Sequence, residues 1–133
     1  MGQKVHPTGF RLGISTEYTS KWYAGSKDYS SYLLEDHRIR EYMKKQLENA
    51  SVSKIVIERP TKEAVVNIYT SRPGIVIGKK GEDIEKFRNK IASILKTDKA
   101  TVKVNVKEIK KPELDAQLVA EGITQQLERR IMY

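Results

Sequence analysis

The chain has 133 residues, a mass of 15.3 kDa and a formal net charge of +8. This length predicts one domain. The sequence contains no cysteine, which excludes a disulfide framework, a cysteine zinc site and a thiol nucleophile. With only two histidines, His6 and His37, we expect neither a metal site nor a cofactor. No segment has the apolar length of a signal peptide or a membrane span, so we expect a cytosolic protein without membrane contact.

The positive charge is concentrated in one part of the chain. Residues 72–111 contain 12 basic and 5 acidic residues, whereas the remaining segments are nearly balanced. A local positive field favours a polyanionic partner, and nucleic acid is the commonest one. The alternative on charge alone is a solubilising face of an ordinary domain.

The first half of the chain predicts an arm, a helix and a hairpin. Residues 1–27 are rich in glycine and show no period, which is typical of an irregular arm. Residues 28–50 predict an amphipathic helix, because apolar side chains recur at mostly three- and four-residue steps. These are Tyr32, Ile39, Tyr42, Met43 and Leu47. The β-rich runs 55–57 and 64–70, separated by a polar turn at 61–63, predict a hairpin.

The second half predicts two helical segments and a strand. A short piece at 75–77 is followed by a glycine loop, and then by a helix with one apolar stripe. The stripe consists of Ile84, Phe87, Ile91, Ile94 and Leu95. In residues 101–109 three valines alternate with polar residues, which predicts a half-buried strand with a basic outer face. The valines are Val102, Val104 and Val106, and the outer residues are Lys103, Asn105 and Lys107.

The end of the chain predicts a further helix over residues 112–133. Its apolar stripe is Ala116, Val119, Ala120, Ile123, Leu127 and Ile131. It reaches Tyr133 without a glycine cap or a proline stop, so we expect the first helix of a truncated second domain. The expected architecture is α+β, with the order α-β-β-α-α-β and a three-stranded mixed sheet packed on helices. Its expected divisions are an arm at 1–27, the main domain at 28–111 and this helix.

The loop at residues 78–81, Gly-Lys-Lys-Gly, has the chemistry of a phosphate-binding segment. Gly78 and Gly81 allow positive φ and a close approach of the backbone to a sugar-phosphate strand. The start of the following helix adds N–H donors and a positive dipole end, and Lys79 and Lys80 add charge. Two glycines at this spacing also occur by chance in a chain of this composition. The alternative is therefore that the segment is only a surface turn.

The residues around this loop distinguish these possibilities. The run Val76-Ile-Gly-Lys-Lys-Gly-Glu-Asp-Ile84 resembles the signature of KH domains, in which the loop holds about four nucleotides of a single strand. The element order resembles the type II KH domain. A nucleotidase phosphate loop is excluded by its spacing, and an RNA-recognition motif by the absence of aromatics in residues 101–109.

Further segments resemble the family of bacterial-type small-subunit ribosomal protein three, over the whole chain. They are residues 1–13, 51–60, 72–83, 111–122 and 126–130. The resemblance implies binding to small-subunit ribosomal RNA near the head of the subunit and a position at the messenger entry channel. It also implies that ribosomal proteins two, ten and fourteen are neighbours. Family members continue beyond the position of Tyr133, and the basic residues credited with unwinding messenger RNA follow that point.

Together these features predict an RNA site at the loop and a second contact on the arm. The candidate RNA-binding residues are Ile77, Gly78, Lys79, Lys80, Gly81, Arg72, Lys86, Lys4, His6 and Arg11. The arm contact follows mostly from the resemblance; without RNA the arm would be a frayed terminus. Two alternatives remain open, namely a KH-type ribosome-assembly or transcription factor and a protein-interaction module.

Other polar and aromatic residues have structural explanations. We expect Trp22 and Tyr23 to pack on the core rather than stack on a base. His37 is expected to be solvated or locally hydrogen-bonded. Capping of the helix start and ion pairing with Lys86 and Arg88 are enough to explain the acidic residues Glu82, Asp83 and Glu85. No nucleophile, base and metal set is near them, so an enzyme is not expected.

Overall fold

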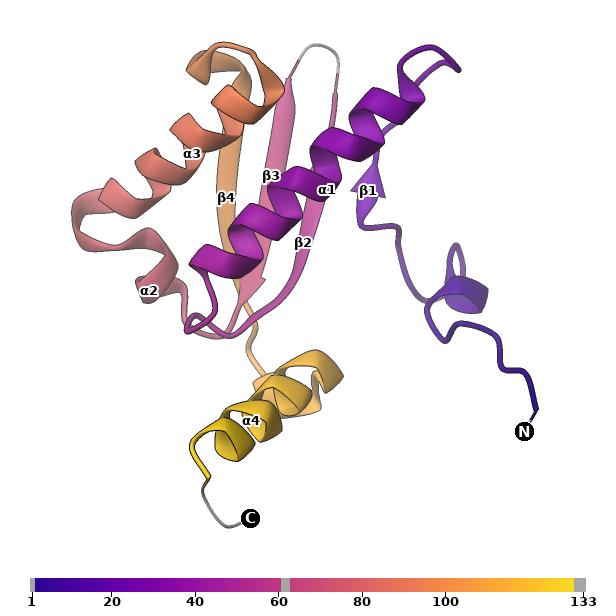
Figure 1. The fold of residues 1–133 in the computed structure, drawn as a ribbon, viewed down its shortest axis with the longest axis vertical. Coiled ribbons are helices and arrows are strands. Elements are labelled where there is room, and N and C mark those ends of the chain that lie inside the picture. Colours follow the sequence, from indigo (N-terminus) through magenta and orange to yellow (C-terminus); the bar gives the residue numbers. More distant parts are fainter. Residues whose placement is uncertain (1, 61–62, 131–133) are drawn as a thin grey trace.

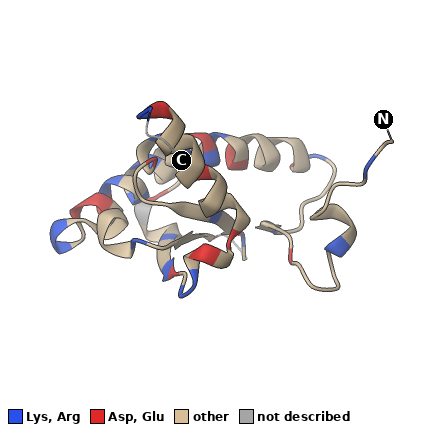
Figure 2. Cartoon of the chain, turned by 90° about the horizontal axis from the view of Figure 1, so that it is seen from below, with Lys and Arg blue, Asp and Glu red and all other residues tan. Residues whose placement is uncertain are grey.

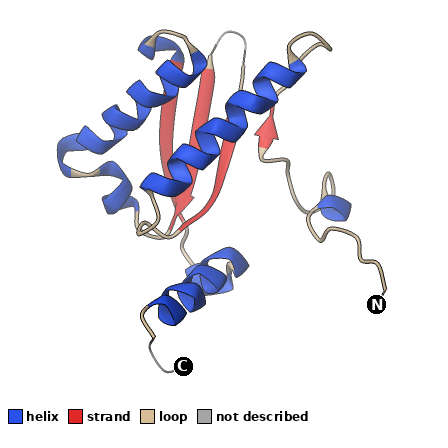
Figure 3. Cartoon of the chain, viewed as in Figure 1, coloured by secondary structure: helices blue, strands red, loops and turns tan. Residues whose placement is uncertain are grey.

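The computed structural model describes residues 2–60 and 63–130 and forms a four-stranded sheet with helices (Figure 1). The strand order is β1-β2-β3-β4, in which β2 and β3 are antiparallel and the outer pairs are parallel. The strands are β1 (Ser20–Lys21), β2 (Val52–Glu58), β3 (Ala64–Thr70) and β4 (Val102–Glu108). The α-helices are α1 (Tyr29–Gln46), α2 (Pro73–Ile77), α3 (Glu82–Leu95) and α4 (Ala116–Glu128). Figure 3 shows the same view by type of secondary structure.

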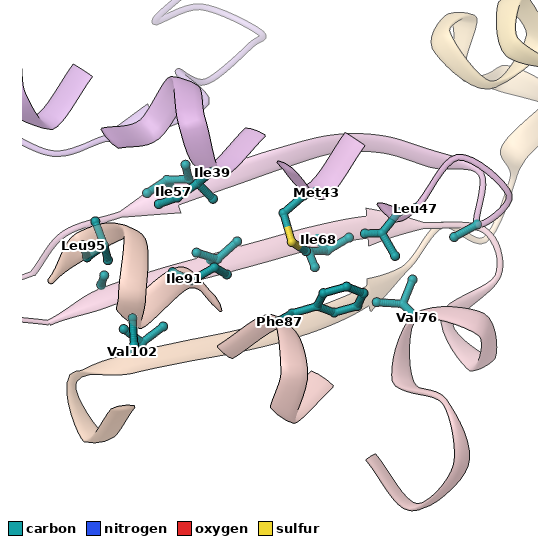
Figure 4. Packing of buried hydrophobic residues seen from close by; sticks show 14 residues of the cluster. Ile39, Met43, Leu47, Ile57, Ile68, Val76, Phe87, Ile91, Leu95 and Val102 are labelled. Atoms are coloured by element: carbon teal, nitrogen blue, oxygen red, sulfur yellow. The ribbon is translucent and has the colours of Figure 1, made fainter. Parts of the chain in front are cut away.

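The core lies between one face of the sheet and the helices α1, α2 and α3 (Figure 4). The predicted stripes of α1 and α3 supply most of its helical side chains, and alternate residues of β2, β3 and β4 supply the rest. The larger members are Ile39, Met43, Leu47, Ile57, Val66, Ile68, Val76, Phe87, Ile91, Leu95 and Val102. Burying one such side chain stabilises the fold by about 1.5–3 kcal/mol. The periodic pattern therefore located this core correctly.

The α+β class and the element order are confirmed, but the sheet has a fourth strand that was not predicted. β1 lies inside the segment expected to be an irregular arm, and it pairs with β2 in parallel. At its start the Ile57 N–H donates to the Thr19 carbonyl at 2.8 Å. A strand of two residues has no alternation to detect, so its partner across the sheet determines it.

Element boundaries also differ from the predicted ones. α1 ends at Gln46, four residues before the expected end, in a turn where the Ala50 N–H donates to the Leu47 carbonyl. β2 is longer than the predicted run 55–57. The strands β2 and β3 are antiparallel neighbours, as the predicted hairpin requires. Of its expected turn, Thr61 and Lys62 lie outside the described residues.

A buried carboxylate joins β1, α1 and the end of β2. Asp36 on α1 is fully buried, and its Oδ1 accepts from Arg59 Nη2 at 2.7 Å. Its Oδ2 accepts from Trp22 Nε1 at 2.5 Å and from Ser20 Oγ at 3.2 Å. A buried charge is tolerated only when it is paired and hydrogen-bonded, and Asp36 meets both conditions. This contact fixes the chain between the arm and α1.

The two aromatic residues of the arm behave differently. The ring centroid of Trp22 lies 5.4 Å from that of Tyr29 and 5.5 Å from that of Tyr32. Trp22 therefore packs on α1, as a structural role requires, but outside the core cluster. Tyr23 is 93% exposed, and the prediction that it packs on the core was wrong. In an extended segment successive side chains point to opposite sides, so only one of two neighbours can face α1.

We expect Asp36→Asn to lower the free energy of unfolding by about 1–3 kcal/mol, because an amide cannot accept all the hydrogen bonds of the buried carboxylate. The Arg59 guanidinium loses one of its two counter-charges and keeps the other, since its Nη1 lies 2.9 Å from Glu35. Urea unfolding followed by Trp22 fluorescence measures the change. The control is Glu41→Gln, which alters an exposed carboxylate paired with His37 at 3.2 Å; it should cost less than about 0.5 kcal/mol. Equal losses in the two variants would contradict this role of Asp36.

The C-terminal helix is shorter than predicted and its apolar stripe is exposed. A 3-10 turn, Pro112–Leu114, precedes α4, which begins where Asp115 accepts from the Gln117 and Leu118 N–H groups. The stripe residues Val119, Ile123 and Leu127 are 46%, 53% and 54% exposed. Of the predicted segment, Ile131 and Tyr133 lie outside the described residues. The polar side of α4 borders a groove of about 590 Å³ beside α1 and β2.

Because this stripe faces solvent, we expect the chain to self-associate more than a variant ending at Lys111. Contiguous apolar surface of several hundred Å² commonly marks an interface or an aggregation site. Sedimentation velocity at matched concentrations compares the two forms. As a second variant, Val119→Gln with Ile123→Gln and Leu127→Gln should sediment like the shortened chain. Identical behaviour of all three forms would show that the stripe is not adhesive.

Candidate nucleic-acid interface

The loop between α2 and α3 is built from residues with positive φ. Gly78, Lys80 and Gly81 have φ values of 71°, 54° and 76°, and a 3-10 turn spans Lys79–Gly81. L-residues rarely adopt this region because Cβ approaches the carbonyl oxygen, at a cost of about 1–2 kcal/mol. Glycine at two of the three positions removes most of that cost. The chain therefore reverses tightly enough to start α3 immediately after α2.

The two glycines are needed for different reasons. Gly78 combines its φ with a ψ of −171°, a region that is essentially restricted to glycine. A Cβ at Gly78 would also overlap the carboxylate of Asp83 in the first turn of α3. A Cβ at Gly81 would meet nothing within 4 Å, so Gly81 is required only for its left-handed backbone.

Core contacts on either side hold the loop in place. Val76 of α2 is fully buried, and Phe87 of α3 is 8% exposed. The Arg88 Nε donates to the Val102 carbonyl at 3.0 Å, which joins α3 to β4. The loop thus projects from a rigid helix pair, at the edge of the molecule away from the N-terminal arm (Figure 1).

Exposed charge and exposed apolar surface occur together at this edge. Lys79 and Lys80 are exposed, and Figure 2 shows a basic turn at the end of the molecule opposite the N-terminus. Ile75 and Ile77 are 49% and 38% exposed on either side of the buried Val76. The lysines can bind phosphate, and the isoleucines can contact the faces of bases.

The acidic residues at the start of α3 form only part of the predicted contacts. Glu85 pairs with Arg88 at 3.7 Å, so ion pairing is confirmed there. The predicted capping was not found, since no side-chain hydrogen bond caps this terminus in the part of the chain that the structure describes. Because Gly81 has no side chain to occupy them, the first N–H groups of α3 are available to an anion.

Two other predicted residues lie near the loop. Arg72 is exposed at the start of α2, where its backbone N–H donates to Thr70 Oγ1 at 3.0 Å. Lys86 is exposed on the second turn of α3. Both extend the positive surface from the loop along α2 and α3.

The three arm residues belong to a separate surface. Lys4, His6 and Arg11 lie on the exposed N-terminal segment, which extends from the other side of the molecule (Figure 1). The Nδ1 of His6 accepts from the Thr8 and Gly9 N–H groups at 3.2 and 3.3 Å. The Arg11 Nη1 donates to the Pro7 carbonyl at 2.6 Å. The arm therefore contains a local turn. Because Nδ1 of His6 is used within this turn, its other ring nitrogen, Nε2, is the one available to a phosphate.

Two features of this edge were not predicted from the sequence. One is Ile75, whose exposure follows from the helical arrangement of α2: when Val76 points into the core, both neighbours point outward. The other is the outer edge of β4, which among the described residues pairs with β3 alone and lies against α2 and α3. A strand edge presents unpaired backbone N–H and C=O groups to a ligand.

The described residues contain no cluster of three or more His, Cys, Asp or Glu that could hold a metal ion. None of the helices that the structure describes is long and apolar enough to cross a membrane. Outside the acidic start of α3, the candidate interface is lined by basic and apolar groups and by backbone amides. Such groups bind and orient an anionic strand.

Comparison with known proteins identifies the class. A family described as "KH domain" matches residues 38–114, from within α1 to the 3-10 turn before α4. The chain belongs to the KH-domain family. The type of fold inferred from the loop signature is therefore confirmed.

Over its whole length the chain is similar to curated proteins named small ribosomal subunit protein uS3. Identity is 59% with the protein of Pseudoalteromonas translucida, 56% with that of Paracidovorax citrulli and 55% with that of Leptothrix cholodnii. The alignments cover 100% of this chain but 56%, 44% and 46% of the relatives, so the chain spans about half their length. The resemblance to small-subunit ribosomal protein three is confirmed. These names are those of a ribosomal protein, rather than of an enzyme or an assembly factor.

We expect Gly78→Ala to destabilise the domain more than Gly81→Ala, for which a cost of about 1–2 kcal/mol is anticipated from the left-handed backbone alone. The difference arises from the overlap with Asp83 and from the glycine-only ψ of Gly78. Adding Asp83→Ala to Gly78→Ala should recover part of the loss. Urea unfolding of the unmodified chain, Gly78→Ala, Asp83→Ala and the double variant gives the coupling. Additive effects would exclude the steric contact.

Proposed function

We propose that this chain is a non-enzymatic, structural RNA-binding part of the small ribosomal subunit, which holds single-stranded RNA at the loop of residues 78–81. One observation carries the proposal. Two glycine-dependent backbone turns place Lys79 and Lys80 beside the uncapped N-terminus of α3. This arrangement supplies charge, backbone donors and close approach at one point, as the binding of a phosphodiester strand requires.

Each group in the interface has a distinct role in this proposal. Lys79 and Lys80 neutralise phosphates, and Gly78 lets the strand reach the backbone. The exposed faces of Ile75 and Ile77 contact the bases, and the outer edge of β4 offers hydrogen-bond partners to base edges. Arg72 and Lys86 extend the phosphate contacts on either side. In KH domains such a loop holds about four nucleotides.

The ribosomal setting follows from the relatives. Proteins named small ribosomal subunit protein uS3 match the whole chain at 55–59% identity, which supports ribosomal RNA as the main partner and the cytoplasmic ribosome as the location. The finer assignments follow from the same resemblance. They are messenger RNA at the entry channel, bound by the loop, and ribosomal proteins two, ten and fourteen as neighbours.

The arm forms a second contact with ribosomal RNA in this proposal. Lys4, Arg11 and His6 are exposed, and His6 and Arg11 belong to one local turn of residues 6–11. Phe10 is 56% exposed and Ile14 is 89% exposed, so this segment contributes little to the core. Its role is therefore in assembly with RNA rather than in the stability of the domain.

We also propose that α4 is the first helix of a second unit. The relatives are about twice as long as the chain, and α4 leaves Val119, Ile123 and Leu127 exposed. An apolar stripe at helical spacing is typical of a face that packs on another element. This assignment puts the boundary between the two units near residues 110–112.

Replacing both loop lysines tests the proposed function. We expect Lys79→Asp with Lys80→Asp to abolish binding of a short single-stranded RNA and to leave the chain folded, because both side chains are exposed. Contact with about four phosphates implies a slope near −3 for log affinity against log salt concentration in the unmodified chain. Fluorescence anisotropy measures the affinity, and circular dichroism checks the fold.

A matched control separates the loop from net charge. Lys44 and Lys45 are exposed on α1, and replacing both with Asp changes the total charge equally. This control should retain most of the RNA affinity at moderate salt. If both double variants lose binding equally, the loop is not the binding site.

A further inference from the structure

The face of the sheet opposite the helices carries a cross-strand row of side chains that the loop site does not use. In β2, β3 and β4, Lys54 is in register with Tyr69, and Tyr69 with Lys107. The neighbouring residues Ile55, Ile68 and Val106 belong to the face that packs on the core. Because side chains alternate along a strand, the row points away from α1 and α3.

Two ammonium groups converge on one aromatic ring in this row. Lys54 Nζ lies 4.8 Å from the centroid of the Tyr69 ring, and Lys107 Nζ lies 5.5 Å from it. Both lysines are exposed, and neither takes part in any ion pair between described residues. The ring attracts both cations, but their mutual repulsion remains until an anion binds between them.

The other lysines of this face are already paired. The Lys21 Nζ lies 2.5 Å from a carboxylate oxygen of Glu17 and 3.9 Å from one of Glu58. The Lys103 Nζ lies 3.5 Å from a carboxylate oxygen of Glu63. The hydrogen bond with Lys21 is the main reason that the pKa of Glu17 lies below its ordinary value. Lys54 also contributes to that lowering, from beyond ion-pair distance. The uncompensated positive charge of the face is therefore concentrated in the row.

We propose that the row Lys54–Tyr69–Lys107 is a second RNA-binding surface, which contacts phosphate groups of a structured RNA backbone. The two ammonium groups bind phosphate oxygens, and the Tyr69 ring between them keeps them in position. This surface goes beyond the loop function, because it lies on the open face of the sheet and uses none of the loop residues. A domain with both sites holds two segments of RNA, one at the loop of residues 78–81 and one on the open face of the sheet.

Charge and composition favour RNA over a protein as the occupant. The cores of protein interfaces are depleted in lysine and need apolar anchors that become buried. On this face Val56 is buried, with 4% of its surface exposed, so it cannot serve as an apolar anchor. The adjacent Asn105 donates its side-chain amide to the Asn67 Oδ1 at 3.1 Å. The face thus offers cations and amides but little apolar surface. Such groups contact phosphates without reading bases, which suits a duplex or folded RNA.

Substitutions that remove the two positive charges, with two RNA probes, test this surface. The double variant Lys54→Gln with Lys107→Gln is compared with the unmodified chain, using an RNA hairpin without a tail and a single-stranded tetranucleotide. We expect about tenfold weaker binding of the hairpin and a salt slope reduced by roughly 2, as expected for two lost phosphate contacts. Binding of the tetranucleotide should stay within about twofold, since it requires only the loop.

The control is Lys44→Gln with Lys45→Gln, which removes the same charge from α1. If it weakens hairpin binding as much as the row variant does, or if the row variant changes nothing, the proposal is overturned. Should the double variant unfold, Lys107→Gln alone should reduce the slope by about 1, and an unchanged slope overturns the proposal. Failure of the tetranucleotide to bind the unmodified chain would refute the loop function, whereas the hairpin comparison still decides the sheet face.

Discussion

In the part of the chain that the structure describes, α1, α2 and α3 pack on one face of the sheet, and the positions of the other functional elements follow from that constraint. α1 and α3 bury their apolar stripes against alternate residues of β2, β3 and β4. This burial orients α3, and therefore the glycine loop at its start. It also leaves the opposite face, with Lys54, Tyr69 and Lys107, open to solvent. A second helical layer on that face would remove one of the two basic surfaces.

The loop combines a rigid support with an unusual backbone. Val76 and Phe87 anchor its two flanking helices in the core, and Gly78 and Gly81 adopt positive φ between them. Because the support is packed, the loop backbone and the first N–H groups of α3 are held in place, which would lower the entropic cost of the proposed RNA binding. The arm is attached differently, through the buried carboxylate of Asp36, which holds Trp22 and Ser20.

The fold and the loop were predictable because local sequence determines them. Helical and strand periods identified Ile39 and Phe87 as core residues, and the glycine spacing marked the loop. By contrast, β1 and Asp36 depend on partners far away in the sequence, so no local pattern signals them. Asp36 lies three residues before the buried Ile39, on the same side of α1. A charged residue at such a position is seldom buried without a partner, and the partner Arg59 could not be identified from the sequence. The pairing of Lys54 with Tyr69 likewise required the strand register.

The most direct test of this account is a titration of the ¹⁵N-labelled 133-residue chain with a single-stranded RNA tetranucleotide, followed by NMR. We predict saturable shifts of the amides at Ile77, through the turn Lys79–Gly81, in the first turn of α3 and along the outer edge of β4. The amides of α4 should keep their positions. Shifts confined to α4 or to the arm, with none at Lys79–Gly81, would contradict the assignment of the loop as the RNA-binding site.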